Sequence, residues 1–366
     1  MNRLQSILAL LTLTLLTSCD TREEGVAAAP QAESINFATS ITSTSSKGMV
    51  VGSGDELIGG GYTNIKLTGF GVFAFQTLHE EWLDVESLST TTPDFMYNQE
   101  IWYDDDSWKY SPIKYWAGET NTLEDAFKYT FFAYAPYQSS QTTTNGCIFS
   151  SNDKAGRPTI DFTIAESAFN MVDLVTDSRV DQTKWGADVD FEMTHQLARV
   201  SFSAKCAMEE PTSYIVVNSM KFLVDYSPAL YTSARFNYSL DSKYGDWTGL
   251  TPATEDYSFD SILKPSVKVS SEETQLFLDN HYLFLLPPNA EEGVSEESSC
   301  RVEMLLNICS ADGTLLKENQ TASFKLQKGA LKQGSATNYL ITYTDIDPIE
   351  STAIKFTISE CETPLP

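Results

Sequence analysis

Apolar and polar residues alternate in many short runs along this chain. In ARVSFSAKC every second residue from Val200 to Cys206 is apolar, and the residues between them are polar. Side chains of a β-strand point alternately to the two faces of a sheet, so this period predicts a strand with one buried face. The closing run AIKFTIS repeats the pattern, with Ile354, Phe356 and Ile358 on one side.

Such runs form two series that meet near residue 186. The first series contains IKLTGFGVFAF (Ile65 to Phe75), FMYNQEIWY, WKYSPIKYW, KYTFFAYAP, TIDFTIA and MVDLVT. The second continues from ARVSFSAKC with SYIVVNSMKFLV, ALYTSARFNYSL, TQLFLDNHYLFLLPP, CRVEMLLNIC, ASFKLQKG and NYLITYTDI. Short strands with turn signals about every ten residues, and no long helical period, predict an all-β protein. We expect two tandem β-sandwiches, over residues 51–186 and 187–366.

The first 18 residues have the order of a secretory signal. Arg3 precedes an apolar run from Ile7 to Leu16, and small residues follow. About ten apolar residues are too few for a spanning helix, which needs about twenty. The ending LTSC resembles the lipobox of bacterial lipoproteins, so residues 1–18 are expected to be cleaved and Cys19 to carry an acyl anchor such as palmitate. An ordinary signal peptide with an incidental cysteine is the alternative.

Residues 19–50 have the composition of a linker that contains one short apolar element. They are rich in Ala, Ser, Thr and Glu. Only Ile35 and Phe37, in the run SINFA, have the character of a strand. The interpretation is a lipidated linker with one short strand.

The net charge of the chain limits the classes of partner that can be expected. The chain has 50 acidic and 24 basic residues, and its formal net charge is -26. So acidic a surface repels phosphate backbones and anionic lipid headgroups. Nucleic acid is therefore not expected as a partner. Hydrophobic residues make up 42% of the chain, which is enough for packed cores.

The cysteines do not form a dense disulfide framework. A lipidated Cys19 leaves an odd set without CxxC spacing: Cys147, Cys206, Cys300, Cys309 and Cys361. Disulfides are permitted in an exported chain. Buried single thiols are nevertheless favoured, with a bridge between Cys300 and Cys309 as the leading exception.

No motif of an enzyme or of a cofactor site is found. The three histidines, His79, His195 and His281, each stand alone in or beside an apolar run, which favours core or strand-edge positions. HEEW at His79 lacks the second histidine of a zinc protease, and GxSxG, P-loop and dinucleotide fingerprints are missing. We therefore predict no enzyme and no cofactor. A glycosidase with paired carboxylates is the weakest alternative.

The acidic run from Asp104 to Asp106 could offer oxygen ligands to calcium. It lacks the ligand spacing and the glycine of an EF-hand loop. A solvated hairpin tip is therefore favoured, and no metal site is predicted.

Aromatic residues concentrate in IWYDDDSWKYSPIKYW. If exposed, its aromatic side chains could stack on sugars: Trp102, Trp108, Tyr110, Tyr115 and Trp116. In paired strands such residues more often form core and cross-strand pairs. A surface lipoprotein that binds glycans with these aromatics remains the alternative function.

Several runs resemble the Bacteroidetes fimbrillin family, the lipoprotein-derived type V pilins. They are INF, FGVFAF, FMYNQEIW, WKYSPIKYW, YTFFAYAP, DLVT, FEMTHQLARVSF, YLFLLPP, NYLITYTDI and AIKFTIS, and they span nearly all of the chain after Cys19. The resemblance implies two β-sandwich domains of transthyretin-like topology. It also implies a structural subunit of a fimbria or a surface adhesin, anchored by lipid at the outer membrane. Its partners would be other pilin subunits, in a homo- or heteropolymer, and possible partners include a ligand on host or bacterial surfaces.

The resemblance also implies assembly by strand exchange. In the family a short N-terminal strand fills a groove until a trypsin-like protease removes it, and a neighbouring subunit then supplies a strand, generally its C-terminal segment. This is β-augmentation, with main-chain hydrogen bonds for affinity and alternate side chains for register. The occupant here would be Ile35 to Phe37, and the donor Ile354, Phe356 and Ile358. An ordinary last strand is the alternative for the donor.

The cleavage site departs from the family pattern. The family is commonly cut after an arginine, but residues 23–156 contain none. Arg22 precedes the strand, so a cut there would leave Ile35 and Phe37 in place. Lys47, in STSSKGMV, stands where removal of the strand requires a cut. We therefore expect cleavage at Lys47 or, for a subunit that stays anchored, no cleavage.

Overall fold

Nearly all regular elements of the described residues are β-strands, which confirms the predicted all-β class. The structure, a computed structural model, describes residues 33–45, 48–51, 65–84, 91–117, 126–139, 148–150, 156–186, 188–224, 230–288, 300–326, 329–344 and 356–362. Its helices are single turns: α1 (Ile65–Thr68), η1 (Trp82–Asp84), η2 (Ala168–Asn170) and η3 (Asp260–Ile262). Within these stretches no helix is long and apolar enough to cross a membrane.

The largest sheet in the described part of the chain has eight strands. In order across the sheet they are β2 (Gly48–Val51), β1 (Phe37–Ser45), β10 (Val189–His195), β9 (Val175–Gln182), β6 (Tyr129–Ala135), β3 (Phe70–Gln76), β4 (Met96–Asp104) and β5 (Ser107–Lys109). β1 runs parallel to β10, and the other neighbouring strands are antiparallel. The N-terminal strand thus pairs with a strand from the middle of the chain.

Both faces of this sheet are buried at its centre. Along β3, Phe73 and Phe75 pack into one hydrophobic cluster, while Val72 and Ala74 pack into another on the opposite face. A sheet buried on both sides has strands that are apolar throughout. This explains the continuous apolar run FGVFAF.

A four-stranded sheet covers one of these faces. Its strands, in order, are β14 (Asp246–Pro252), β13 (Tyr231–Asn237), β8 (Thr159–Thr163) and β7 (Ile148–Ser150). Tyr238, next to β13, donates a hydrogen bond of 3.0 Å to the carbonyl of Ala133 and packs 5.1 Å from the ring of Phe132. Because β8 pairs with β13 and β1 with β10, strand pairing crosses residue 186. The two sandwiches expected on either side of that residue stay a prediction.

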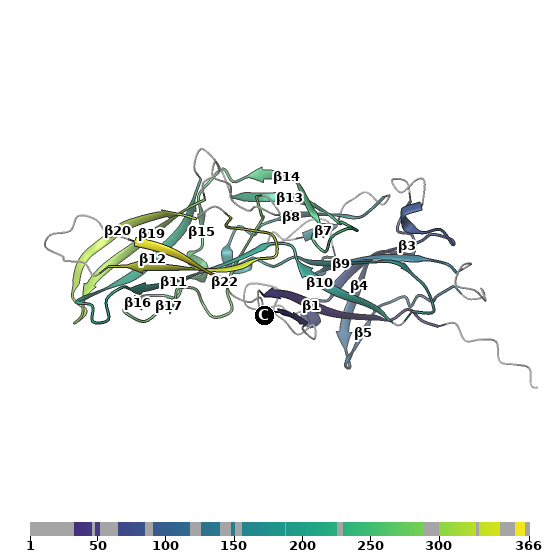
Figure 1. The fold of residues 1–366 in the computed structure, drawn as a ribbon, viewed down its shortest axis with the longest axis horizontal. Helices are drawn as coiled ribbons and strands as arrows, with labels where there is room; N and C mark the ends of the chain where they lie inside the picture. The colour runs from purple at the N-terminus through teal and green to yellow at the C-terminus, as the bar shows by residue number, and fades with distance from the viewer. Residues whose placement is uncertain are drawn as a thin grey trace, which may run out of the picture.

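Two further sheets pack face to face at the other end of the elongated molecule (Figure 1). One contains β17 (Thr274–Gln275), β11 (Ala198–Cys206), β21 (Ala336–Tyr343) and β22 (Phe356–Glu362), with β18 (Leu283–Leu285) also on β11. The other contains β15 (Tyr257–Ser258), β12 (Ser213–Leu223), β19 (Arg301–Ser310) and β20 (Leu315–Lys325), with β16 (Val267–Val269) also on β12. Phe202 of β11 and Phe324 of β20 meet between the sheets at 6.1 Å.

The prediction of one continuous strand from Ile65 to Phe75 is wrong. Residues 65–68 form the helical turn α1, and β3 begins only at Phe70. Gly69 between them has a φ of +66°, and a Cβ atom there would lie 2.6 Å from the carbonyl oxygen of Ile101. Only glycine fits this break without strain.

Candidate functional site

β1 and the residues before it bury every second side chain. Ile35, Phe37, Thr39 and Ile41 are all at most 9% exposed, whereas Asn36 between them is exposed. The sequence predicted only Ile35 and Phe37 as strand-like. It missed Thr39 and Ile41 because the run TSITSTS is mostly polar.

The main chain at the start of β1 has hydrogen-bonding partners on both edges. On one side the amide of Val189 donates to the carbonyl of Asn36 over 2.9 Å. On the other side the amide of Ile35 donates to the carbonyl of Lys114 over 3.0 Å, and a second bond of 3.0 Å runs from Trp116 to Glu33. The N-terminal segment therefore closes the gap between β10 and residues 114–116.

Phe37 sits among aromatic rings from its neighbour β10 and from segments that do not pair with β1. Its ring lies 5.9 Å from that of Phe191 on β10, nearly parallel, and 5.3 Å from that of Tyr110. Phe70 and Phe131, on β3 and β6, are 6.3 and 5.9 Å away. The large sheet therefore curls around β1, and Phe37 is the centre of the enclosed cluster.

Tyr110 fixes the backbone of the same segment. Its hydroxyl donates a hydrogen bond of 2.8 Å to the carbonyl of Ile35, in a buried position. It also accepts from the amide of Lys114 over 3.2 Å. Burial raises the pKa of Tyr110, so the hydroxyl keeps its proton and acts as a donor.

These residues define what we call the β1 site: β10 and residues 114–116 on either edge, with Phe70, Tyr110 and Phe131 beneath. Chemically, the site binds one extended strand. It offers main-chain partners on both sides and buried places for alternate side chains, as in β-augmentation.

The predicted processing residues lie outside the described residues. Cys19 and Arg22 precede residue 33, where the description begins. Lys47 belongs to the two residues between the end of β1 at Ser45 and the start of β2 at Gly48. In sequence, a cut after Lys47 separates β1 from the strands that follow.

The candidate donor forms the last strand of its own sheet. β22 pairs antiparallel with β21, and Phe356 lies opposite Tyr343 and Ile358 opposite Ile341. β22 is the outermost strand of that sheet. Ile354 lies outside the described residues.

The three tryptophans of the predicted sugar platform do not share one exposed face. Trp116 is 6% exposed and packs on Tyr129 at 5.1 Å. Trp108 pairs with Tyr103 across the β4–β5 hairpin and packs on Phe70, whereas Trp102, which is 36% exposed, lies on the opposite face of the hairpin. A platform built from all three is therefore wrong.

The acidic run is the tip of the β4–β5 hairpin. Asp105 and Asp106 have φ values of 47° and 58°, which a two-residue hairpin turn requires. The amine of Lys109 lies 2.7 Å from Asp104 and 3.2 Å from Asp105, so both carboxylates already share one cation of the chain. Among the described residues no group of three or more His, Cys, Asp or Glu could hold a metal ion.

Two of the histidines are buried and the third lies on a turn. His195 is 3% exposed, and its Nδ1 contacts a carboxylate oxygen of Asp173, which is 1% exposed. His281 is 5% exposed, and its Nδ1 bonds the carbonyl of Asp279 in its own turn over 2.9 Å. His79 is exposed and follows β3, so the core or strand-edge position expected for it is wrong.

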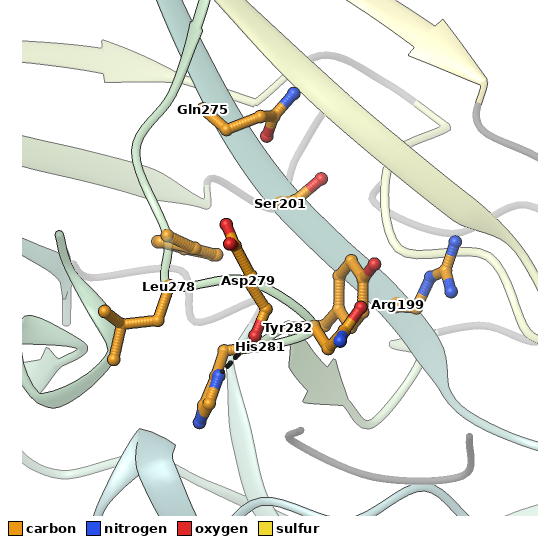
Figure 2. Close-up of a pocket in the computed structure, with 9 residues that line it drawn as sticks. Arg199, Ser201, Gln275, Leu278, Asp279, His281 and Tyr282 are labelled. Atoms are coloured by element: carbon orange, nitrogen blue, oxygen red, sulfur yellow. Dashed lines mark hydrogen bonds between the residues drawn. The ribbon is translucent and has the colours of Figure 1, made fainter. Parts of the chain in front are cut away.

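A polar pocket of about 430 Å³ opens beside β11 (Figure 2). The guanidinium of Arg199 lies 4.3 Å above the ring of Tyr282 in this pocket. Figure 2 shows the Asp279 carboxylate turned toward the strand that carries Ser201, and the His281 ring turned away from it. Asp279 is paired with Lys264 at 2.9 Å. The pocket can hold a small polar ligand, but it brings no nucleophile and base together.

Cys206, Cys300 and Cys309 are free and buried, as favoured from the sequence, so the alternative of a bridge between Cys300 and Cys309 is wrong. Cys300 comes just before β19 and Cys309 near its far end, so at about 3.3 Å per residue they are roughly 30 Å apart. A disulfide needs Cα atoms within about 7 Å. Burial raises the pKa of Cys300 to about 12.

We therefore expect Cys206, Cys300 and Cys309 to resist a water-soluble maleimide in the folded chain, because all three side chains are buried and shielded from the reagent. Labelling before and after denaturation, followed by peptide mass spectrometry, measures this. All three should be labelled only after denaturation. A peptide cross-linked between Cys300 and Cys309 would contradict the structure.

The fold and the β1 site define an all-β protein that holds its own N-terminal strand between β10 and residues 114–116. The chain belongs to the fimbrillin-like family, whose profile matches residues 66–360, and this confirms the resemblance found in the sequence. It is 29% identical over 324 residues to a fimbrium subunit, Fim1C, of Phocaeicola vulgatus, a match that covers 80% of each chain. A crystal structure of a fimbrial protein from Bacteroides vulgatus has the same fold, with a TM-score of 0.67 at 23% identity over 91% of this chain and 99% of that one.

Proposed function

We propose that this chain is a structural subunit of a cell-surface fimbria, and that its subunits join by strand exchange at the β1 site. The observation that carries the proposal is the position of residues 33–45, the segment that contains β1. It has main-chain partners on both edges and buries Ile35, Phe37, Thr39 and Ile41. The similarity to a fimbrium subunit supports the same function. The relatives are named as fimbrial proteins, which favours a structural role over an enzyme.

Physical chemistry supports the order of events. An empty β1 site would expose two strand edges and a ring of aromatic side chains, which is an aggregation hazard. β1 covers the site while the subunit travels to the outer membrane on the lipid of Cys19. A cut at Lys47 releases β1 from the rest of the chain, and a strand from a neighbouring subunit then takes its place. A cut at Arg22 removes the lipid but leaves β1 seated.

The glycan-binding alternative is not favoured. It needs an exposed aromatic surface, and Trp102, Trp108 and Trp116 lie on different faces or in the core. The polar pocket beside Arg199 is the place where a small surface ligand of host or bacterial origin would be sought.

The position of the cut can be tested with an arginine-specific protease. Residues 23–156 contain no arginine, so such a protease cuts the wild-type N-terminal segment only at Arg22. We expect a Lys47→Arg chain to form ladders of multimers after treatment, because β1 is freed. Gel electrophoresis without boiling and size-exclusion chromatography measure the result.

Wild-type and Lys47→Gln chains are the matched controls and should stay monomeric under the same treatment. If Lys47→Arg is cut at residue 47, loses β1 and still forms no multimer, strand exchange at the β1 site is wrong. If the controls also form ladders, release of β1 is not the trigger.

A further inference from the structure

The polar pocket beside β11 forms where the pairing along one edge of that strand is interrupted. β17 pairs with residues 203–204 of β11, and β18 pairs with residues 198–200. Between these strands the chain turns away from β11, because Phe277 bridges to Leu263 and the amide of Leu278 donates to the carbonyl of Ile262. The pocket occupies the space between Ser201 and this excursion (Figure 2).

The pocket has the size and the opening of a site for a small ligand. Its volume is about 430 Å³. Pockets for small molecules usually measure about 300–1,000 Å³. Gln275, Asp279 and Asn280 line the pocket and are exposed, so it opens to solvent on their side. One sugar ring can therefore enter from solvent.

The lining offers both donors and acceptors of hydrogen bonds. The side-chain amides of Gln275 and Asn280 provide both, and the carboxylate of Asp279 provides acceptors. The hydroxyl of Ser201 donates to Asn338 over 3.0 Å, so it meets a ligand as an acceptor. Each hydroxyl group of a sugar donates one hydrogen bond and accepts others. This mixed lining therefore fits a ring that carries several hydroxyl groups.

Arg199 gives the pocket a buried positive charge. Its side chain is 7% exposed, and the guanidinium stacks on the ring of Tyr282 at 4.3 Å. Stacking uses the face of a guanidinium, whereas its N–H donors lie in the plane of the group. Such a group can bind the two oxygens of a carboxylate side by side.

The charges around Arg199 favour an anion of single charge. Burial lowers the pKa of Arg199, although Tyr282 and Asp173 oppose this shift. The cost of burying the guanidinium charge is therefore only partly offset within the chain, and the anion of a ligand would offset more of it. Asp279 is paired with Lys264 at 2.9 Å, which weakens its repulsion of that anion.

A carboxylate fits this charge better than a phosphate ester does. Among the described residues, Arg199 is the one Arg or Lys that lines the pocket. A carboxylate brings one negative charge, whereas a phosphate ester brings about 1.5 to 2 at neutral pH. The additional charge of a phosphate would meet the Asp279 carboxylate without a second cation in the lining.

We propose that this pocket binds an acidic sugar, which is a sugar ring with one carboxylate. The guanidinium of Arg199 donates to the carboxylate, and the ring hydroxyls bond with Gln275, Asp279 and Asn280. In Figure 2 the ring of Tyr282 separates the Arg199 guanidinium from the Asp279 carboxylate, so the two ends of the ligand meet different groups. The inference goes beyond the proposed strand exchange and does not depend on it.

Four small ligands test the class of compound. The full, uncut chain is titrated with glucuronate, glucose, acetate and glucose 6-phosphate, and calorimetry or ligand-observed NMR measures the affinities. Glucuronate differs from glucose only in the carboxylate that replaces the hydroxymethyl group. We expect glucuronate to bind about tenfold more tightly than glucose, because charge-assisted hydrogen bonds are stronger than neutral ones. Acetate and glucose 6-phosphate should also bind more weakly than glucuronate.

An added charge tests the place of binding. Asn280→Asp puts a carboxylate into the pocket at a φ of 60°, a conformation that aspartate tolerates. Asn319→Asp is the matched control, because Asn319 is exposed on β20, has a φ of 54° and does not line the pocket. We expect Asn280→Asp to weaken glucuronate binding about fivefold or more through like-charge repulsion, and Asn319→Asp to leave it unchanged.

A third variant, Arg199→Gln, removes the positive charge. It should abolish the preference for glucuronate over glucose. Arg199 is buried, so thermal unfolding is compared with wild type first. If this variant does not fold, Asn280→Asp at the exposed rim still decides the question.

Several outcomes would overturn the inference. Equal affinity for glucuronate and glucose excludes a role of the carboxylate, and equal affinity for acetate excludes a role of the ring. Tighter binding of glucose 6-phosphate makes the carboxylate the wrong anion. Equal loss in Asn280→Asp and Asn319→Asp places binding outside the pocket.

The same variants separate this inference from the proposed function. Asn280→Asp combined with Lys47→Arg should still form ladders after the arginine-specific protease. Ladders without glucuronate binding by the wild-type chain overturn the sugar site alone. Glucuronate binding without ladders in any cleaved chain overturns strand exchange alone.

Discussion

Replacing Phe37 with alanine is expected to lower the free energy of unfolding of the uncut chain by about 3–5 kcal/mol, as for other buried phenylalanines. The ring is 6% exposed and joins β1 to Phe70, Phe131 and Phe191, which belong to three other strands. Removing it leaves a cavity that a closed sheet cannot fill by small shifts. Urea unfolding followed by tryptophan fluorescence measures the change, because Trp116 belongs to the same hydrophobic cluster.

Trp185→Ala is the control for loss of a large aromatic side chain. Trp185 is 47% exposed, so its replacement should change the free energy of unfolding by no more than about 0.5 kcal/mol. The Phe37→Ala chain should also exchange the amide hydrogens of β1 faster than wild type, because β1 is held less firmly. Equal effects of the two substitutions would mean that β1 does not depend on the aromatic cluster.

Strands with strong alternation could be predicted from sequence, because their burial follows a local rule. Val200, Phe202, Ala204 and Cys206 are all buried, as the period of ARVSFSAKC predicted. The outer face of the same strand is buried as well, although polar residues occupy it. Ser203, for example, donates to Glu273 over 2.7 Å from a distant segment that covers this face. The local sequence pattern of the strand does not predict that a distant segment covers this face.

The site could be predicted only in part, since its extent depends on distant segments. Ile35 and Phe37 are apolar and stood out within a polar linker. Thr39 did not, because a threonine is buried only when a neighbouring sheet provides the space, and strand preference depends on that context. The closure of the sheet by residues 33–35 on 114–116 joins segments far apart in the chain, and sequence periodicity carries no information about such pairing.

The cysteines and tryptophans also show that sequence patterns do not predict how residues are placed relative to one another in space. Spacing alone left a bridge between Cys300 and Cys309 open, but an extended strand between them holds the thiols apart. The aromatic run around Trp108 was open to two interpretations, and the pairing of Trp108 with Tyr103 decides which residues share a face. For the cysteines, the extended strand β19 sets the distance between the thiols. For the tryptophans, the register of the β4–β5 hairpin decides which side chains share a face. Composition carries neither piece of information.

Removing the carboxylate of Asp173 is expected to destabilise the chain by roughly 3 kcal/mol or more, because breaking a buried pair leaves one partner uncompensated. Asp173 lies just before β9 and contacts His195 at the end of β10, and both side chains are almost fully buried. The carboxylate also acts on Arg199. Burial lowers the pKa of Arg199, and the charges of Tyr282 and Asp173 oppose this shift in part. Asp173→Ala therefore removes a partner from both His195 and Arg199. Urea unfolding measures the combined change in the free energy of unfolding.

A double-mutant cycle separates these two effects. His195→Ala removes only the imidazole, so it should be less destabilising than Asp173→Ala, which also withdraws the negative charge from Arg199. The double variant should cost less than the sum of the single ones, because the contact between the two residues is lost only once. Since β10 pairs with β1, the Asp173→Ala chain should also release β1 more readily after cleavage at residue 47. Strict additivity of the two substitutions would contradict a direct Asp173–His195 interaction.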